Sequence, residues 1–382
     1  LLNTLQLSSN ILSVFKEIQG PYSFIYFQKT NNLLYFGRDI IGRHSLLLKV
    51  NTDENILTLT SVASKQINKI IEIPAIGIFV MNLTNLRINL ACYPWKEPDL
   101  RFTDIIETLE THLGIDIDIK KTIEDIHKRA VEHSKIGVLF SGGLDSAILT
   151  LIADKYISQN EPIDLINVAF EKNNEKQDME NQYDVPDRKT GKQTFLELTK
   201  ICPKRKWNFI EVNVSQAELQ KYRSSHICNL LHPLCTILDE SLGCAVWFAS
   251  RAKGIIHSGT DIYESPCRVL LLGMGADELF GGYMRHRTIL RHKGWDALTQ
   301  ELNIELARIS ERNLGRDDRI VSDHGRQSRL PYLDENIVDY PTDKMPSGLG
   351  DKLLLRLVAY KLGFRNTANF PKRAFQFGSR IA

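Results

Sequence analysis

The six residues Ser141-Gly142-Gly143-Leu144-Asp145-Ser146 stand between two apolar runs, residues 136–140 and 147–153. This order predicts a buried strand, a tight glycine loop and a helix. Two adjacent glycines let the backbone turn sharply and come close to a ligand. The unpaired N–H groups in the first turn of the helix favour an anion in front of them. The stretch therefore predicts a strand, loop and helix unit that binds phosphate.

The polar side chains of this loop narrow the choice of ligand. Ser141 and Ser146 add hydroxyl donors, whereas the carboxylate of Asp145 repels a bare phosphate. A bridging divalent cation removes that conflict, and Mg²⁺ commonly joins carboxylates to phosphates. The loop thus predicts pyrophosphate binding with Mg²⁺. For so short a motif, a polar turn that merely caps a helix stays the alternative.

The composition is that of an ordinary globular protein. The 382 residues suit two domains, with 43% hydrophobic and 25% charged residues. A net charge of +2 gives no electrostatic reason to expect nucleic acid or a membrane as the main partner. Every apolar run is shorter than the roughly 18 residues of a membrane span.

The six cysteines are scattered, and none belongs to a Cys-x-x-Cys pair. They form neither a zinc pattern nor a disulfide framework, so we expect a reducing compartment and a cytoplasmic protein. The chain begins at Leu1, without an initiator methionine, and stops at Ile381-Ala382. We interpret it as a fragment.

The hydrophobic pattern changes along the chain. Residues 1–95 are β-rich, with Asn31-Asn32 as a hairpin turn, and a proline-flanked linker leads to a helix at 103–113. Strands and helices then alternate, which predicts a parallel sheet with both faces covered. The candidate strands are 135–140, 163–170, 207–214 and 268–273. We expect the polar run 171–192 to be a loop without chemistry.

A second glycine loop follows the last of these strands, with the sequence Gly273-Met274-Gly275-Ala276-Asp277-Glu278. Because ligands of open α/β sheets bind at the carboxyl ends of strands, both glycine loops should open onto one edge. Asp145 and Asp277 would then each supply a carboxylate to Mg²⁺ bound with ATP. An acidic pair that merely starts a helix is the alternative.

A third segment, Lys372-Arg373-Ala374-Phe375-Gln376-Phe377-Gly378, lies near the end of the chain. Cleavage between the α and β phosphates develops charge on pyrophosphate, which a cation stabilises without proton transfer. Phe375 and Phe377 would anchor the strip that carries Lys372. A solvated basic strip is the alternative.

These segments resemble known families. The first loop resembles the PP-loop of ATP pyrophosphatases, which split ATP between the α and β phosphates and adenylylate an acceptor. More broadly, the chain resembles the synthetase domain of asparagine synthetases and the related β-lactam synthetases. The matching motifs are Asp318-Arg319, Arg329-Leu330-Pro331-Tyr332-Leu333-Asp334, Lys352-x-x-x-Arg356 and Lys372-x-x-Phe375-x-x-Gly378. Residues 20–26 and 37–47 resemble the end of a class II, Ntn-type glutaminase domain, and segments 186–191, 243–251 and 372–380 indicate one subgroup of the family.

The resemblance implies an α/β protein with two domains. Residues 1–95 would be the C-terminal portion of an Ntn-type glutamine amidotransferase domain, and residues 103–382 a parallel-sheet ATP-pyrophosphatase domain, which is adenine nucleotide α-hydrolase-like. Ser141, Gly142, Gly143, Leu144, Asp145 and Ser146 would hold the phosphates of ATP, with Leu139, Val168 and Gly273 along the adenosine. Asp145 and Asp277 would hold Mg²⁺, and Lys372 would be catalytic. In this family the β-carboxylate of aspartate is activated as its AMP ester, and ammonia displaces AMP.

Three departures from the family pattern qualify this reading. Met274 and Gln327 stand at the acceptor end of the site, where the family usually has glutamates, and neither side chain can act as a base. A class II glutaminase uses an N-terminal cysteine whose amino group activates the thiol, whereas residue 1 is leucine. We therefore expect no glutamine hydrolysis by this chain, and an altered acceptor, a weakened activity or ATP binding without turnover stay open.

The leading hypothesis is an asparagine synthase (glutamine-hydrolysing)-like ligase, an amidoligase of amino-acid biosynthesis. It would use ATP, Mg²⁺, aspartate or a related carboxylate, and nitrogen from ammonia or glutamine. The competing hypothesis is a degenerate member that binds ATP or partner proteins without turnover. A PP-loop tRNA-modifying enzyme explains neither the glutaminase-like part nor Lys372. The acceptor and the oligomeric state stay open.

Overall fold

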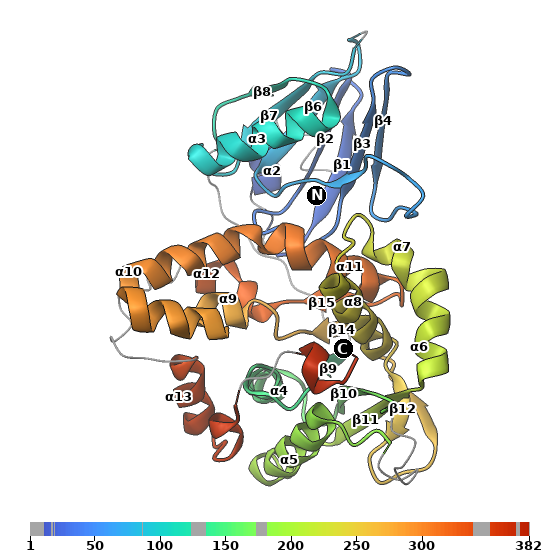
Figure 1. The fold of residues 1–382 in the computed structure, drawn as a ribbon, viewed down its shortest axis with the longest axis vertical. Coiled ribbons are helices and arrows are strands. Elements are labelled where there is room, and N and C mark those ends of the chain that lie inside the picture. Colours follow the sequence, from blue (N-terminus) through green and yellow to red (C-terminus); the bar gives the residue numbers. More distant parts are fainter. Residues whose placement is uncertain are drawn as a thin grey trace. The chain divides into compact units, whose positions relative to one another are not determined.

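The computed structural model describes residues 11–16, 18, 20–85, 87–123, 135–172, 182–338, 352–371 and 375–381 (Figure 1). The chain forms two compact units. The first comprises Leu1–His133, His232–Leu234 and Ser310–Arg319, and the second Ser134–Leu231, Cys235–Ile309 and Ile320–Ala382. The predicted α/β class with parallel strands is confirmed. The assignment of the two parts to glutaminase-type and ATP-pyrophosphatase-type domains stays a prediction.

The first unit contains two β-sheets. One has five strands in the order β1-β2-β6-β7-β8, and the other has three in the order β4-β3-β5. Its strands are β1 (Ser23–Gln28), β2 (Leu33–Arg38), β3 (Leu47–Asn51), β4 (Ile56–Thr60), β5 (Ile71–Glu72), β6 (Gly77–Asn82), β7 (Leu90–Pro94) and β8 (Ile117–Ile119). The predicted hairpin at Asn31-Asn32 joins β1 to β2, with Gln28 opposite Leu33.

Two helices belong to the first unit, α2 (Ile11–Lys16) and α3 (Leu100–Leu113). Asp99 caps α3 by accepting the Phe102 N–H at 2.8 Å, and Gly114 ends the helix at φ 69°. Phe102, Ile106 and Leu109 bury one face of α3 against Phe36, Phe79 and Leu90 of the sheet. The contacts thus group α3 with the N-terminal unit, whereas the sequence prediction began the second domain at residue 103.

A later piece of chain, Ser310–Arg319, completes the first unit. The Ser45 N–H donates to Asp318 Oδ2 at 2.8 Å, and Arg319 Nη1 donates to Ser45 Oγ at 2.7 Å. Arg319 also pairs with Glu72, and both side chains are at most 8% exposed. The predicted Asp318-Arg319 motif is therefore a buried polar contact of the N-terminal unit.

The second unit is built on a seven-stranded sheet in the order β13-β12-β11-β10-β9-β14-β15. The strands are β9 (Ile136–Leu139), β10 (Ile163–Phe170), β11 (Trp207–Val214), β12 (Lys253–Ile256), β13 (Ile262–Glu264), β14 (Val269–Leu271) and β15 (Gln327–Arg329). Five neighbouring strands are parallel, namely β11, β10, β9, β14 and β15. The β12–β13 hairpin pairs with β11 and extends the sheet with antiparallel strands. The four candidate strands are thus confirmed, with the first and the last shorter than predicted.

Helices cover both faces of this sheet (Figure 1). Leu165 of β10 packs in one core with Ile148 of α4 (Leu144–Tyr156) and Leu198 of α5 (Pro186–Ile201). On the other face Phe170 meets Phe248 of α8 (Ile237–Ser250), with ring centroids 5.9 Å apart. The remaining helical segments of this unit are α6 (Gln216–Tyr222), η2 (Arg223–Ile227), α7 (Cys228–Leu231), α9 (Ala276–Phe280), α10 (Met284–Ile309), η4 (Pro331–Leu333), α12 (Glu335–Val338), α13 (Leu353–Lys361), η6 (Thr367–Asn369) and α14 (Phe375–Gly378). Between α10 and β15 lie η3 (Ser310–Leu314), in the first unit, and α11 (Gly315–Ser322), which the division between the units crosses.

The expectation of a loop over residues 171–192 is wrong for its last seven residues, because α5 begins at Pro186. The helix escaped the hydrophobic pattern because its buried face starts with polar residues, Asp187 and Arg188. Proline in the first turn loses no hydrogen bond and presets the helical φ. Residues 173–181 lie outside the described part of the chain.

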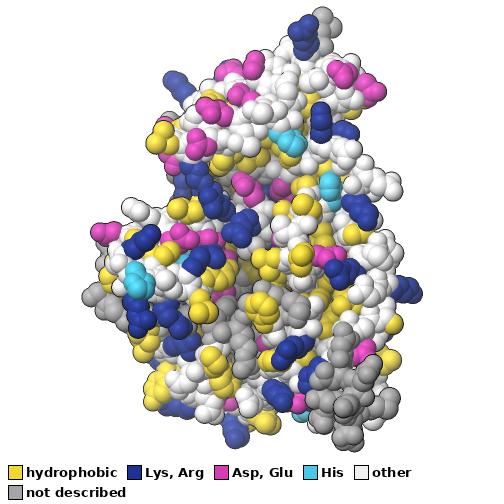
Figure 2. Space-filling view, in the orientation of Figure 1, with side chains coloured by type: hydrophobic (Ala, Val, Ile, Leu, Met, Phe, Trp, Pro, Cys, Tyr) yellow, Lys and Arg dark blue, Asp and Glu magenta, His cyan; other side chains and the backbone are white. Residues whose placement is uncertain are grey.

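Acidic and basic side chains are interspersed over the visible face of the molecule, in line with the net charge of +2 (Figure 2). Within the described residues, no helix is long and apolar enough to cross a membrane. All six cysteines are free. Burial raises the pKa of Cys92 and of Cys244 to about 12, so both thiols are protonated at neutral pH.

Candidate functional site

The predicted phosphate loop lies between β9 and α4, beside the neighbouring strands β10 and β14. Gly142 has φ 76°, and a Cβ there would lie 2.5 Å from the backbone of Gly191 on α5. Gly143 precedes α4 without a side-chain hydrogen bond to the helix, so no side chain caps the first-turn N–H groups. These groups and the helix dipole favour an anion, as the sequence predicted.

The second glycine loop follows β14 and contacts the first. A Cβ on Gly273 would lie 3.0 Å from the Cβ of Asp145. Gly275 has φ 89°, and a Cβ there would lie 2.5 Å from the Leu333 side chain. Since β9 and β14 are adjacent parallel strands, both loops leave the same edge of the sheet, where the direction of strand order reverses. The expectation of a shared edge is confirmed.

Lys352 joins the two loops. Its Nζ lies 2.6 Å from Asp145 Oδ2 and 2.6 Å from Asp277 Oδ1, and its side chain is 3% exposed. Burial alone would lower the pKa of Lys352, but the carboxylates of Asp145 and Asp277 outweigh it and hold this pKa above its ordinary value. The two predicted metal carboxylates are therefore brought together around one ammonium group.

The backbone around Lys352 supports this arrangement. Lys352 has φ 56° and ψ 33° and directly precedes α13. A Cβ on Gly282 would collide with both Asp277 and the Lys352 stem, so only glycine fits there. Sequence reasoning had quoted Lys352 within a motif but gave it no role. Its signal was the lysine four residues before Arg356, which lines the same pocket.

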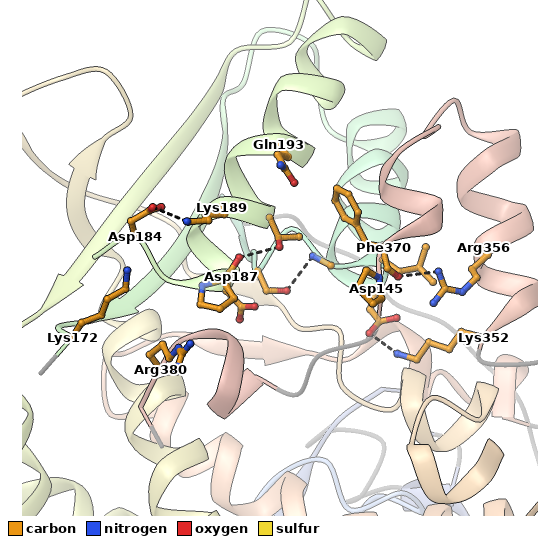
Figure 3. A pocket seen from close by; sticks show the side chains of 16 residues that line it. Asp145, Lys172, Asp184, Asp187, Lys189, Gln193, Lys352, Arg356, Phe370 and Arg380 are labelled. Atoms are coloured by element: carbon orange, nitrogen blue, oxygen red, sulfur yellow. Dashed lines mark hydrogen bonds and ion pairs between the residues drawn. The ribbon is translucent and has the colours of Figure 1, made fainter. Parts of the chain in front are cut away.

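A pocket of about 460 Å³ opens in front of the first loop (Figure 3). The loop contributes four predicted residues, and α5 and the C-terminal segments contribute most of the rest. The lining residues are Ser141, Gly143, Leu144, Asp145, Lys172, Asp184, Pro186, Asp187, Lys189, Thr190, Gln193, Lys352, Arg356, Phe370, Pro371 and Arg380. Five of them carry positive and three carry negative side chains, which leaves an excess of two positive charges and favours an anionic ligand.

The charges within the pocket are partly paired. Lys189 Nζ lies 2.9 Å from Asp184 Oδ2, a pair that Figure 3 marks with a dashed line. Arg356 Nη1 donates to the carbonyls of Ala368, at 2.8 Å, and Phe370, at 3.0 Å, which holds the segment that carries Phe370 and Pro371. Four of the five α5 residues that line the pocket, all except Gln193, fall in the run 171–192, to which the sequence analysis assigned no chemistry.

The carboxylate pair fits Mg²⁺. Asp145 Oδ1 is buried and has no hydrogen-bond partner among the described residues, although Oδ2 of the same group contacts Lys352. Mg²⁺ typically uses one or two carboxylates together with substrate phosphates and water. In the described ranges, no group of three or more His, Cys, Asp or Glu side chains could hold a metal ion alone. A metal here would thus need a phosphate ligand as well.

The remaining predicted positions are placed less completely. Leu139, the last residue of β9, is half-buried and lies opposite Ile166 of β10. Val168 is buried two residues further along β10. Neither residue lines the pocket, and nor do Gly142, Ser146, Gly273 and Asp277. Lys372 lies outside the described residues, but Pro371 just before it and Arg380 after it both line the pocket. Its catalytic role stays a prediction.

The two departures from the family pattern lie at different ends of the sheet. Met274 follows Gly273 in the second glycine loop and so lies at the carboxyl edge of the sheet. Gln327 pairs in register with Val269, the first residue of β14, and so lies at the opposite end of the strand. The expectation that Gln327 belongs with Met274 at the acceptor end is therefore wrong, because the strand direction separates them.

The two acidic residues of the second loop, Asp277 and Glu278, have different partners. Asp277 contacts Lys352, whereas Glu278 is 4% exposed and accepts a hydrogen bond from the Tyr283 hydroxyl at 2.5 Å. Burial, with the charges of Glu278 and Asp277, raises the pKa of Tyr283 far above its ordinary value. Glu278 is therefore held inside the protein rather than facing the pocket.

Comparisons with known proteins agree with the predicted family. The asparagine synthase family model matches residues 119–200. The human asparagine synthetase domain-containing protein 1 is 36% identical over 98% of this chain and 79% of its own length. An asparagine synthetase domain-containing protein of Saccharomyces cerevisiae is 33% identical over 100% of this chain and 74% of its length. The putative glutamine-hydrolysing asparagine synthetase 1 of Methanocaldococcus jannaschii is 24% identical over 85% of this chain and 56% of its length.

Proposed function

The chain belongs to the asparagine synthetase family, and we propose that it is an ATP-dependent amidoligase. In this proposal a carboxylate is adenylylated by ATP, pyrophosphate leaves, and ammonia then displaces AMP to give an amide. One observation carries the proposal. Asp145 and Asp277, from two different glycine loops, converge on Lys352 beside a pocket with an excess of positive charge.

The phosphates of ATP would bind at the start of α4. The uncapped N–H groups of residues 144–146 and the Ser141 hydroxyl offer donors there. Asp145 and Asp277 are the residues that would hold Mg²⁺, which neutralises phosphate charge when bound. Lys352 carries a fixed positive charge to the same place, where negative charge develops on the departing pyrophosphate.

Lys372 would add a second cation during adenylylation and during attack on the acyl-adenylate. This role comes from the family resemblance, and the pocket positions of Pro371 and Arg380 are compatible with it. The acceptor would be aspartate or a related carboxylate. Because Met274 stands in place of the family's glutamate, that end of the reaction differs from a standard asparagine synthetase.

A second candidate is a member of the family that binds ATP without turnover. Met274 favours it, since a thioether cannot accept the proton that an attacking amine must lose. Both candidates share the phosphate site and differ only in whether pyrophosphate is released. A single assay therefore separates them.

The test measures AMP and pyrophosphate from Mg²⁺-ATP with ammonia and a panel of carboxylate amino acids that includes aspartate. The amidoligase gives both products with at least one acceptor, and Lys352→Met abolishes them. Lys361→Met, at the exposed end of the same helix, is the matched control and retains activity. Thermal stabilisation by Mg²⁺-ATP without any product would support the second candidate. Neither binding nor product would contradict both.

A further inference from the structure

The start of α5 is polar where it should be apolar. Asp187 is 7% exposed and Arg188 only 2% exposed, and the helix packs on the sheet directly beside the phosphate loop. Burying a guanidinium is costly even when it is paired, and a well-packed apolar side chain often stabilises a fold as much or more. Stability alone is therefore a weak reason for an arginine at position 188.

Arg188 holds its neighbours through directed bonds. Its Nη1 lies 2.6 Å from Glu211 Oε2 on β11, which neutralises the charge. Its Nε donates to Asn167 Oδ1 on β10 at 2.7 Å. The fork of the guanidinium thus spans from a carboxylate on one strand to an amide on the next.

Asn167 passes this constraint to the loop. Because its Oδ1 accepts from Arg188, its Nδ2 is fixed toward two carbonyls, those of Phe140 at 2.8 Å and Asp187 at 3.1 Å. Phe140 is the residue immediately before the phosphate loop. The side-chain amide therefore ties the end of β9 to the first turn of α5.

A second contact holds the loop from the same helix. Thr194 Oγ1 donates to the Gly142 carbonyl at 2.7 Å. Gly191 leaves room for Asn167, since a Cβ there would lie 2.8 Å from Asn167 Nδ2. The beginning of the loop is thus held from α5 by Thr194 directly and through Asn167 indirectly.

We propose that Arg188 is a positioning residue for the phosphate site, acting through Asn167 to fix the carbonyl of Phe140 and with it the loop 141–146. Arg188 does not line the pocket, so it touches no substrate itself. The inference rests on the proposed function in one respect, namely that ATP is the ligand of this loop. The rigidity of the loop can be measured without any ligand.

The test variant is Arg188→Met, which keeps the length of the side chain and removes the fork. Glu211 keeps two partners in this variant, Lys192 Nζ at 3.2 Å and His257 Nδ1 at 2.7 Å, so its charge stays compensated. The matched control is Arg205→Met. Arg205 is also buried, but it bonds to Asp154 and to the Ile157 carbonyl beyond the far end of α4.

Two readouts are compared. The backbone amides of Phe140 and Ala147 bracket the loop and are hydrogen-bonded, to the carbonyls of Ile166 and Gly143. Their hydrogen exchange in nucleotide-free protein should become roughly tenfold faster in Arg188→Met and stay unchanged in Arg205→Met. The Kd for Mg²⁺-ATP should rise by roughly tenfold in Arg188→Met only. Both variants should lower the melting temperature, so a merely structural role cannot produce the difference between them.

Asn167→Asp gives an independent check if Arg188→Met fails to fold. It keeps an oxygen for Arg188 and replaces the donor facing Phe140, so the same faster exchange is expected. Equal loop exchange in wild type, in Arg188→Met and in Asn167→Asp would overturn the inference. If wild type bound no ATP, the proposed function would fail, and the exchange measurement would still decide whether Arg188 positions the loop.

Discussion

The two glycine loops, residues 141–146 and 272–278, both leave parallel strands at one edge of the sheet, yet their surroundings differ. The first faces a pocket, has an uncapped helix start and rests on polar side chains of α5. The second is packed inside the protein, with Gly275 against Leu333 and Glu278 bonded to Tyr283. Two similar sequences thus form one loop that lines the pocket and one that packs inside the protein and supports the first loop.

This contrast assigns the ligand chemistry to the first loop and a supporting role to the second, with Lys352 between them. In the proposed reaction the acceptor end would include Met274, on the packed loop, where the family has a glutamate. The nucleotide half of the site is therefore the better supported half. The following four predictions test that division, starting with the largest effect.

Lys352→Met should cost about 3 kcal/mol of unfolding free energy, because two facing half-buried carboxylates lose their shared buried cation. Mg²⁺ alone should restore part of this stability in the variant and change that of wild type much less. Denaturant unfolding with and without Mg²⁺ measures both. A variant as stable as wild type would show that the loops are not joined by this ammonium.

Gly142→Ala and Gly275→Ala compare the loops directly. Both positions have positive φ, but the new Cβ meets rigid backbone at Gly142 and a movable leucine side chain at Gly275. We expect losses of about 3 kcal/mol and about 1 to 2 kcal/mol respectively. Thermal shift with Mg²⁺-ATP should further show lost binding only in Gly142→Ala, and equal loss in both would break the contrast.

Tyr283→Phe tests the packed loop. It removes a donor to buried Glu278 and should cost about 1 to 2 kcal/mol. Because the pKa of Tyr283 is raised above its ordinary 10.0, its stabilising effect is complete below pH 10.0 and is lost as the pH rises further. Unfolding free energies from about pH 8 to about pH 11 should fall less steeply in the variant than in wild type. Parallel curves would contradict the raised pKa.

Lys189→Met should change stability by less than about 0.5 kcal/mol, because its pair with Asp184 is solvent-exposed. It should nevertheless weaken ATP binding about two- to threefold at low salt, since one of five pocket cations is lost. Titration calorimetry at two salt concentrations checks this. Unchanged affinity would mean that the α5 side of the pocket does not sense the ligand charge.

The fold was predictable where apolar runs alternate with glycine loops. Strands 163–170 and 207–214 needed nothing beyond their own residues, because both are buried on two faces. The shared edge of the loops followed from the rule for parallel sheets. The start of α5 was not predictable in this way, because Arg188 is buried by partners 21 and 23 residues away in sequence.

The two carboxylates of the site, Asp145 and Asp277, could be predicted from the sequence, but the contact of both with Lys352 could not. Asp145 and Asp277 carry a local signal, a glycine loop after a strand. Lys352 carries only its spacing to Arg356, which does not reveal a role. That role arises from contacts with Asp145 and Asp277, which lie 207 and 75 positions earlier in the sequence and which only the fold brings close. Gln327 was misplaced for the same reason, because its motif does not reveal at which end of β15 it lies.

The return of Ser310–Arg319 to the first unit bears on how this protein can be divided. Residues 1–133 are not a self-sufficient piece, because Arg319 and Asp318 supply partners to Glu72 and Ser45 inside it. A truncation after residue 133 would leave Glu72 with Arg38 as its remaining arginine and would remove the Asp318 acceptor of the Ser45 N–H. Expression of the N-terminal unit alone would therefore need the later segment, supplied as a separate peptide or spliced in by circular permutation.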